Sequence, residues 1–231
     1  MSVSDLLDRP LYSIPQVDRL LGLTGGTARR WIEGYERAGR RYPPLIRTEL
    51  TSEELVTWGE FVETRLLSEY REAGVPVLHM RPAIEKLREG FNTRYPLAHA
   101  HPFLDVEGRE LVMRAQTAVG LEAPLQLVVI RNEQLVLANR AKQFVDSVEY
   151  KDDVAERVHP APDLQDVVID PLRQFGEPVV RSVPTEVIAE QVRAGDPPEM
   201  IMELYELNRR QIDAALRYEL LRAKAAVDSA A

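Results

Sequence analysis

Apolar residues recur at helical spacing through the last third of the chain, where the helix boundaries can also be predicted. The apolar positions between 187 and 192 predict one helix, and Gly195 stands where a C-terminal stop is expected. Asp196, followed by two prolines and a glutamate, predicts the start of a second helix with Asp196 as its N-cap. Asn208 begins a third apolar series that continues to residue 220. Three short helices with tight turns predict a trihelical helix-turn-helix unit.

A second pair of helices is predicted near the N-terminus. Ser13 and Gln16 have the spacing of a capping box, and the apolar residues that follow them predict a short helix that ends at Gly22. Thr24 is then expected to cap a second helix over residues 25–35. Two short helices joined at a glycine predict a helix-turn-helix motif, whose second helix lies in the DNA major groove.

The segment after this motif predicts a wing and two longer helices. Residues 44–47 are expected to form the short strand of the wing, and residues 52–73 a long amphipathic helix capped by Ser52. Arg81 begins another helix. The wide apolar face of the 52–73 helix suits either packing within the chain or a homodimer seam.

The pattern changes to a period of two between residues 103 and 150. Two hairpins are predicted, one over residues 103–113 with its turn at Glu107–Gly108 and one over residues 126–137. Residues 143–148 are expected to add a strand, and a proline-rich connector follows. We therefore predict an α+β fold with a small antiparallel sheet between two helical units. The expected domains are residues 1–98, 99–160 and 161–231.

Composition narrows the class of protein. The chain has 231 residues and no cysteine, which excludes disulfides and thiolate metal sites and suits a cytoplasmic protein. No apolar run is long enough to span a bilayer, and no secretory signal is visible at the N-terminus. The net charge is −8, but residues 29–41 carry five arginines against two glutamates. Residues 208–224 carry five basic against two acidic residues. Two basic surfaces on an acidic body are compatible with nucleic acid or protein partners.

The first basic surface coincides with the predicted helix-turn-helix. The early residues of its second helix would face base edges, where an arginine can pair with guanine and a threonine can reach a phosphate or a methyl group. The candidate DNA-binding residues are Thr24, Gly25, Thr27, Arg29, Arg30, Arg37, Arg40 and Arg41. The alternative is a docking module in which these arginines form only a solvated face.

Chemistry typical of an enzyme is not evident in the sequence. His99 and His101 could place two imidazoles on one side of a strand, but a zinc site needs further ligands and none is obvious. The aspartates of residues 152–170 are scattered through polar connectors. Phosphate loops, dinucleotide fingerprints and nucleophile elbows are not found. We expect no enzyme activity, no metal and no cofactor.

The N-terminal motif resembles the MerR-type winged helix-turn-helix. The similarity covers about 40 residues and rests on the run from Tyr12 to Thr24 and on Ala28–Trp31. It implies a DNA-binding domain in which a helix pair follows the wing.

The C-terminal part resembles the domain-of-unknown-function family numbered 433. The similarity covers about residues 164–220, is most specific over residues 209–218, and departs from the family pattern at residues 181–183. Members of this family are largely VapB-type antitoxins whose toxins are PIN-like ribonucleases. The resemblance implies a toxin-binding C-terminal segment with Arg209, Arg210, Arg217, Tyr218, Leu221, Arg222 and Lys224 as its candidate residues.

These features predict an antitoxin that neutralises a PIN-like ribonuclease toxin and represses its own operon. The expected partners are the cognate toxin and operator DNA, with a homodimer or a toxin–antitoxin hetero-oligomer as the assembly and no membrane. One alternative is a MerR-like one-component transcription regulator whose middle sheet binds a small effector. Another is an adaptor whose helix-turn-helix units only dock proteins.

Overall fold

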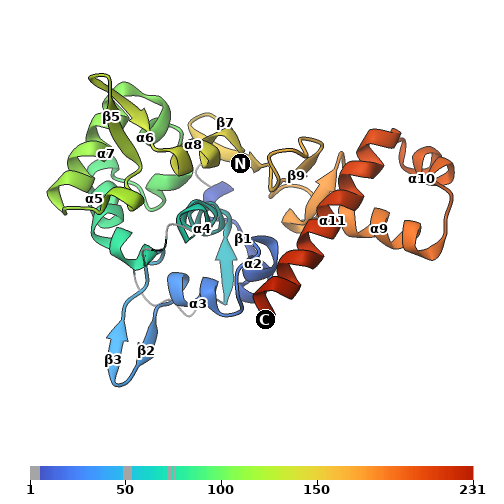
Figure 1. Ribbon diagram of the computed structural model, residues 1–231, viewed down its shortest axis with the longest axis horizontal. Helices are drawn as coiled ribbons and strands as arrows, with labels where there is room; N and C mark the ends of the chain where they lie inside the picture. Colours follow the sequence, from blue (N-terminus) through green and yellow to red (C-terminus); the bar gives the residue numbers. More distant parts are fainter. Residues whose placement is uncertain (1–5, 49–53, 72–73, 75, 231) are drawn as a thin grey trace.

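The computed structural model describes residues 6–48, 54–71, 74 and 76–230. It confirms the α+β class, with helices surrounding several small antiparallel sheets. The larger hydrophobic core lies in the first two thirds of the chain and a second core lies in the last third. Figure 1 shows these two parts as a broad body and a smaller helical lobe, with helix α11 running from the lobe back towards the N-terminal helices.

The N-terminal unit contains the predicted short helix pair. Its elements are β1 (Pro10–Ser13), α2 (Ile14–Leu20), α3 (Thr27–Ile32), β2 (Tyr35–Arg37), β3 (Arg40–Tyr42), β4 (Leu55–Thr57) and α4 (Trp58–Arg71). Ser13 and Gln16 form the predicted capping box at the start of α2. Strand β1 pairs with β4, so the residues before α2 are bound to those before α4.

The predicted helix over residues 52–73 is shorter in the structure. It begins at Trp58, because Leu55–Thr57 are extended in β4, and ends at Arg71. The proposed cap Ser52 lies outside the described residues.

The middle of the chain is mostly helical. It contains η1 (Val77–Met80), α5 (Arg81–Phe91), η2 (Pro96–Ala98), α6 (His101–Leu104), α7 (Val106–Ala118), η3 (Ala123–Leu125), β5 (Val128–Arg131), β6 (Gln134–Leu137) and α8 (Asn139–Asp146). The helix at Arg81 and the hairpin of β5 and β6 are confirmed.

The hairpin predicted over residues 103–113 was wrong, because this segment forms α6 and α7. The buried positions Gly108, Val112 and Ala115 have helical spacing. A Cβ at position 108 would overlap the carbonyl oxygen of His101. Gly108 therefore marks a close approach of two helices and not a turn.

The strand predicted over residues 143–148 was wrong for residues 143–145, and only Val148 is in a strand, β7 (Val148–Lys151). Residues 143–145 belong to α8, in which Ala141 and Phe144 point into the core from one face. A period of two over three residues cannot be distinguished from one turn of a buried helix.

A five-stranded antiparallel sheet connects the two cores. It contains β7 (Val148–Lys151), β8 (Val154–Val158), β9 (Val167–Ile169), β10 (Pro178–Val180) and β11 (Val183–Pro184), in the order β11-β10-β9-β8-β7. Val158 pairs with Ile169 across β8 and β9, and both are in the larger core. Val167 and Val180 lie in the second core. Strands β7 and β8 precede residue 160, and β9, β10 and β11 follow it, so one sheet crosses the predicted domain boundary.

The C-terminal lobe contains the three predicted helices, α9 (Thr185–Ala194), α10 (Pro198–Tyr205) and α11 (Arg209–Ala230). Gly195 ends α9 in a left-handed conformation with φ 95°. Pro197, not Asp196, is the N-cap of α10. Asn208 and Gln211 exchange hydrogen bonds at the start of α11. The second core ends at Tyr218, whereas α11 continues to Ala230, so about the last three turns of this helix lie outside that core.

Polar contacts join the N-terminal unit directly to the segment before β10. The Tyr12 hydroxyl donates to the carbonyl oxygen of Gly176 over 2.9 Å. Arg19, at the end of α2, forms an ion pair of 2.6 Å with Glu177. A Cβ on Gly176 would lie 2.7 Å from the Tyr12 ring carbon that carries the hydroxyl, so this approach requires a glycine.

Glu63 predicts a dependence of stability on pH. Its carboxylate is buried in α4, 3.5 Å from Arg88 Nη2, and accepts a hydrogen bond of 3.0 Å from the Leu97 amide. Burial raises the pKa of Glu63 to about 7. Because the folded state retains this proton more strongly than the unfolded state, stability should fall as pH rises from the ordinary glutamate pKa of 4.5 to about 7. The full loss would be about 3 kcal/mol.

Urea unfolding of the wild type and of Glu63→Gln at about pH 5 and about pH 8 checks this expectation. The neutral variant should lose most of the pH dependence that Glu63 contributes. If the free energy of unfolding changes equally between the two pH values in both proteins, Glu63 does not titrate in this range.

Candidate nucleic-acid interface

The turn between α2 and α3 is built around a buried carboxylate. Asp18 Oδ2 accepts a hydrogen bond of 2.7 Å from the Gly26 amide, and Asp18 Oδ1 accepts one of 2.8 Å from the Ala28 amide. The carbonyl of Asp18 also accepts from the Leu23 amide over 2.8 Å. A carboxylate at a helix N-terminus satisfies free amides and interacts favourably with the helix dipole. Asp18 therefore fixes the direction in which α3 leaves the turn.

Helix α3 presents Arg29 and Arg30 to solvent. Arg29 forms an exposed ion pair of 3.3 Å with Glu33, and Arg30 donates to the Thr27 hydroxyl over 3.1 Å. Thr27 is buried, so its side chain faces the protein instead of the predicted base edges. The helix ends at Ile32, earlier than the predicted residue 35, and its N-cap is Gly26.

Thr24 is therefore not the cap that the sequence predicted. Its hydroxyl lies 2.9 Å from that of Thr27 and accepts from Arg71 Nη2 over 3.0 Å. Gly25 is exposed in the turn. Of the candidates at the start of α3, Gly25, Arg29 and Arg30 are accessible to a ligand.

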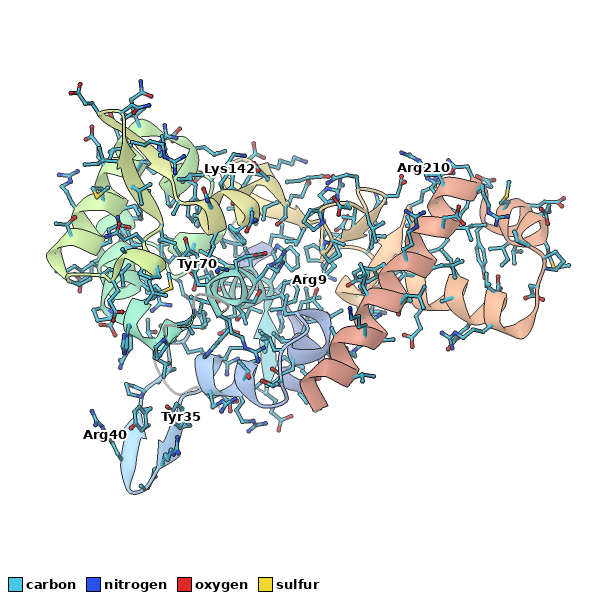
Figure 2. The ribbon with its side chains drawn as sticks, in the orientation of Figure 1. Arg9, Tyr35, Arg40, Tyr70, Lys142 and Arg210 are labelled. Atoms are coloured by element: carbon cyan, nitrogen blue, oxygen red, sulfur yellow. The ribbon has the colours of Figure 1, made fainter. Side chains whose placement is uncertain are left out.

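The wing is a hairpin formed by β2 and β3, upstream of the predicted position. Residues 44–47 are buried, and the amides of Leu45 and Ile46 donate to the Trp31 carbonyl over 2.8 and 3.0 Å. The rings of Tyr35 and Tyr42 stack across the base of the hairpin with centroids 4.6 Å apart. Figure 2 shows Tyr35 and Arg40 on this projecting hairpin.

Three arginines cover the hairpin. Arg37, Arg40 and Arg41 are exposed, and none of them forms an ion pair within the described part of the chain. The Arg40 guanidinium carbon lies 5.3 Å from the Tyr42 ring centroid, which supports its position. With Arg29 and Arg30, these residues form one positively charged surface, which we call the α3–wing surface.

Gly34 determines how the hairpin leaves α3. Its φ is +76°, and a Cβ there would overlap the Tyr42 carbonyl oxygen and lie 2.8 Å from the Pro44 nitrogen. Gly34→Ala should displace the wing and destabilise the protein by about 1–3 kcal/mol. Thermal unfolding and proteolysis of the hairpin measure the two effects. Gly39→Ala is the matched control, because Gly39 has φ +72° but a Cβ there meets no described atom within 4 Å.

Most of the predicted toxin-binding residues already have partners in the chain. Tyr218 is buried in the second core, and burial raises the pKa of its hydroxyl well above the ordinary value. Arg209 pairs with Asp213 at 3.3 Å, Arg210 with Asp166 at 3.0 Å, and Arg222 with Glu219 at 2.8 Å. In the described residues, Arg217 and Lys224 are exposed without an ion pair, and Leu221 is exposed beside them.

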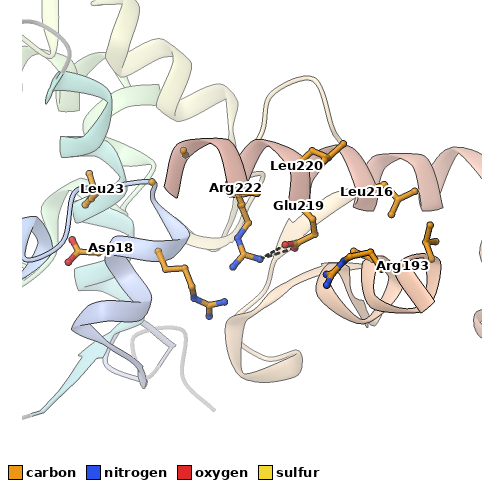
Figure 3. Close-up of a pocket in the computed structure, with 13 residues that line it drawn as sticks. Asp18, Leu23, Arg193, Leu216, Glu219, Leu220 and Arg222 are labelled. Atoms are coloured by element: carbon orange, nitrogen blue, oxygen red, sulfur yellow. Dashed lines mark hydrogen bonds and ion pairs between the residues drawn. The ribbon is translucent and has the colours of Figure 1, made fainter. Parts of the chain in front are cut away.

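A groove of about 730 Å³ separates the α2–α3 turn from the C-terminal helices. Leu23 belongs to one wall, Val192 and Arg193 of α9 to another, and Leu216 and Leu220 of α11 to the third. Figure 3 shows the Glu219–Arg222 ion pair inside this groove. The groove lies at the junction of the two units, away from the middle sheet where an effector pocket was the alternative expectation.

The two candidate metal-binding histidines are each paired with a carboxylate. His99 Nδ1 lies 3.1 Å from Asp153 Oδ2, and His101 Nδ1 contacts Asp105. The described residues contain no group of three or more potential ligands that could hold a metal ion. No helix among them is both long and apolar enough to cross a membrane.

Two known families match this chain. Residues 10–84 match the family described as "Putative DNA-binding HTH domain". The matched segment ends within α5. Residues 167–218 match the family described as "Protein of unknown function (DUF433)". These matches confirm both predicted resemblances, and the first of them points to a DNA-binding protein.

Relatives match along nearly the whole length. "Uncharacterized protein Rv2308" of Mycobacterium tuberculosis is 42% identical over 225 residues, which cover 94% of this chain and 93% of the relative. "Putative antitoxin VapB45" of the same organism is 27% identical over 226 residues, which cover 90% and 93%. The crystal structure of Rv2018 from M. tuberculosis superposes with a TM-score of 0.72 at 25% identity, covering 91% of this chain and 99% of that one. The chain therefore belongs to the family of Rv2308.

The residues that position the site were not among the sequence candidates. Asp18 was missed because its role depends on amides eight and ten residues away. Residue type gave no signal, because Asp18 stands between Val17 and Arg19 in a short helix that also contains Gln16. The wing was predicted at the wrong position because Leu45 and Ile46 are apolar and resemble a strand, whereas in the structure they are buried outside the hairpin.

Proposed function

We propose that this protein is an antitoxin that represses its own operon and neutralises a PIN-like ribonuclease in the cytoplasm. The observation that carries the proposal is the α3–wing surface, which concentrates five exposed arginines on a helix-turn-helix of a protein with net charge −8. The antitoxin half is supported by the relative named as an antitoxin and by the DUF433 region.

On DNA, α3 would enter the major groove and the β2–β3 hairpin would contact the flanking backbone. Arg29 and Arg30 can each pair bidentately with a guanine edge. Arg37, Arg40 and Arg41 extend from the hairpin and would neutralise phosphates. Asp18 would support this geometry by holding the N-terminus of α3.

The nuclease would bind the C-terminal half of α11. Arg217, Leu221 and Lys224 are spaced by four and three residues, so they share one face of the helix. The active site of a PIN-like nuclease is rich in carboxylates, and a guanidinium pairs with a carboxylate through two parallel hydrogen bonds. A cationic face with one exposed leucine can therefore occupy such a site in place of metal and substrate phosphate.

Co-expression with a PIN-like nuclease tests the toxin half, and a gene adjacent to this one is where we expect its cognate nuclease to be encoded. We expect a stable complex in which the nuclease is inactive, and Arg217→Glu with Lys224→Glu should release an active nuclease. Arg37→Glu with Arg41→Glu is a matched control, because it reverses two exposed cations that also lack an ion pair in the described residues but lie on the wing, away from α11. A nuclease that is neither bound nor inhibited would contradict the antitoxin function.

A one-component regulator is the second candidate, and the groove favours it. The cavity of about 730 Å³ has the size of a ligand pocket and touches the turn that holds α3. This candidate requires a small molecule that changes operator affinity when no second protein is present. Thermal-shift screening followed by a DNA-binding assay separates the two functions.

A further inference from the structure

We infer that α11 carries a dimerisation seam for a second copy of this chain, with the two helices parallel. The seam consists of Leu216, Leu220, Ala223 and Val227, which are separated by four, three and four residues. This is the spacing of core positions in a coiled coil. The inference goes beyond DNA and toxin binding because it assigns the surface through which two copies meet.

The seam is exposed from Leu220 onwards, whereas Leu216 packs against the second core. Leu216, Leu220 and Ala223 also line the edge of the groove that faces α9 and the α2–α3 turn. Leu220 is 70% exposed and Val227 is 69% exposed, although both lie on a regular helix. The second core ends at Tyr218, so packing within the lobe does not explain apolar residues at positions 220, 223 and 227. Beyond this point, α11 approaches α2, and Ala225 faces Gly22 from a different side of the helix.

The charges beside the seam favour a second copy and define its direction. Arg217 and Lys224 lie along one side of the seam. Glu219 lies along the other, where its carboxylate also holds Arg222 and accepts from the Thr185 hydroxyl of its own chain. In a parallel pair, a flanking residue meets the flanking residue five positions later on the partner helix, which brings Glu219 against Lys224 of the other copy. In an antiparallel pair, the side with Arg217 and Lys224 would face itself, and like charges would repel.

The position of the helix-turn-helix agrees with the parallel arrangement. The C-terminal half of α11 lies beside α2 (Figure 1), so two parallel α11 helices place both N-terminal units at the same end of the dimer. Two DNA half-sites on one face of a duplex require this arrangement. This supporting point rests on the proposed DNA-binding function, whereas the seam and its charges do not.

Sedimentation of the purified full chain over a concentration series tests the seam without DNA or toxin. We expect a concentration-dependent dimer, and Leu220→Asp should raise its dissociation constant about tenfold or more by placing a charge in the apolar contact. Leu221→Asp is the matched control, since Leu221 is 55% exposed on a neighbouring face and should retain the dimer. Circular dichroism and thermal unfolding check that both variants remain folded.

Cysteine cross-linking tests the direction of the helices, because the chain has no cysteine of its own. In a parallel seam, Ala223→Cys should form a disulfide-linked dimer, whereas Leu221→Cys should not. An antiparallel seam would instead cross-link a mixture of Leu220→Cys and Ala223→Cys.

Three results would overturn the inference. They are a monomer at every concentration, a dimer insensitive to Leu220→Asp, and cross-linking in the antiparallel pattern. If the wild type is monomeric and Leu220→Asp abolishes nuclease capture, the seam binds the toxin and not a second copy. A dimer that does not bind DNA would leave the seam intact and refute only the DNA-binding function.

Discussion

Arg47→Ala is expected to lower the free energy of unfolding by about 3–5 kcal/mol, because it leaves a buried carboxylate without its main partner. Arg47 and Glu60 are both buried, and the guanidinium donates to the two carboxylate oxygens over 2.8 and 3.1 Å. Arg47 also donates to the Leu55 carbonyl over 2.8 Å, just before α4. Urea unfolding followed by circular dichroism measures the loss.

A double variant distinguishes loss of the ion pair from general damage to the core. Arg47→Met with Glu60→Gln removes both charges and should recover much of the stability lost in Arg47→Ala. If the single and double variants are equally unstable, the uncompensated charge is not the cause. Because Arg47 lies five residues after the end of β3, we also expect the single variant to loosen the β2–β3 hairpin.

Arg29→Ala combined with Arg30→Ala should produce the largest loss of DNA affinity, about 1–3 kcal/mol for each base contact removed. Both side chains are exposed on α3, and the hydrogen bonds to the Gly26 and Ala28 amides of the turn come from Asp18. The fold should therefore be unaffected while operator binding weakens. Fluorescence anisotropy with the DNA upstream of the gene measures the affinity at several salt concentrations.

The C-terminal helix offers a matched control for this variant. Arg209→Ala with Arg210→Ala is the same chemical change at two adjacent exposed positions, away from the α3–wing surface. It should leave DNA affinity almost unchanged. Equal effects of the two double variants, or no salt-dependent affinity in the wild type, would favour the adaptor function.

Local signals in the sequence predicted several elements correctly. The capping box of Ser13 and Gln16, the stop at Gly195 and the start at Asn208 depend on residues within one turn of each other. The charge of the α3–wing surface was predictable for a similar reason, since its five arginines lie within thirteen consecutive positions. The two family regions were predicted from motifs that are also local.

The candidate site was predicted only in part. Arg29 and Arg30 are exposed as expected, whereas Thr27 is buried and the wing lies at residues 35–42. On α11, Arg209, Arg210 and Arg222 are paired within the chain, which leaves Arg217, Leu221 and Lys224 available. Exposure and pairing depend on which elements pack together, so residue type alone could not separate these two groups.

The sequence by itself determined the capping box of α2, the stop of α9 at Gly195 and the two basic segments, because these depend on neighbouring residues. Only the tertiary structure decided that Gly108 marks a helix crossing, that Asp18 holds α3, and that Arg47 pairs with Glu60. It also brought α11 beside α2 and thereby formed the groove. These features join residues that are distant in the chain, and their energies come from burial and desolvation, which exist only after the chain has folded.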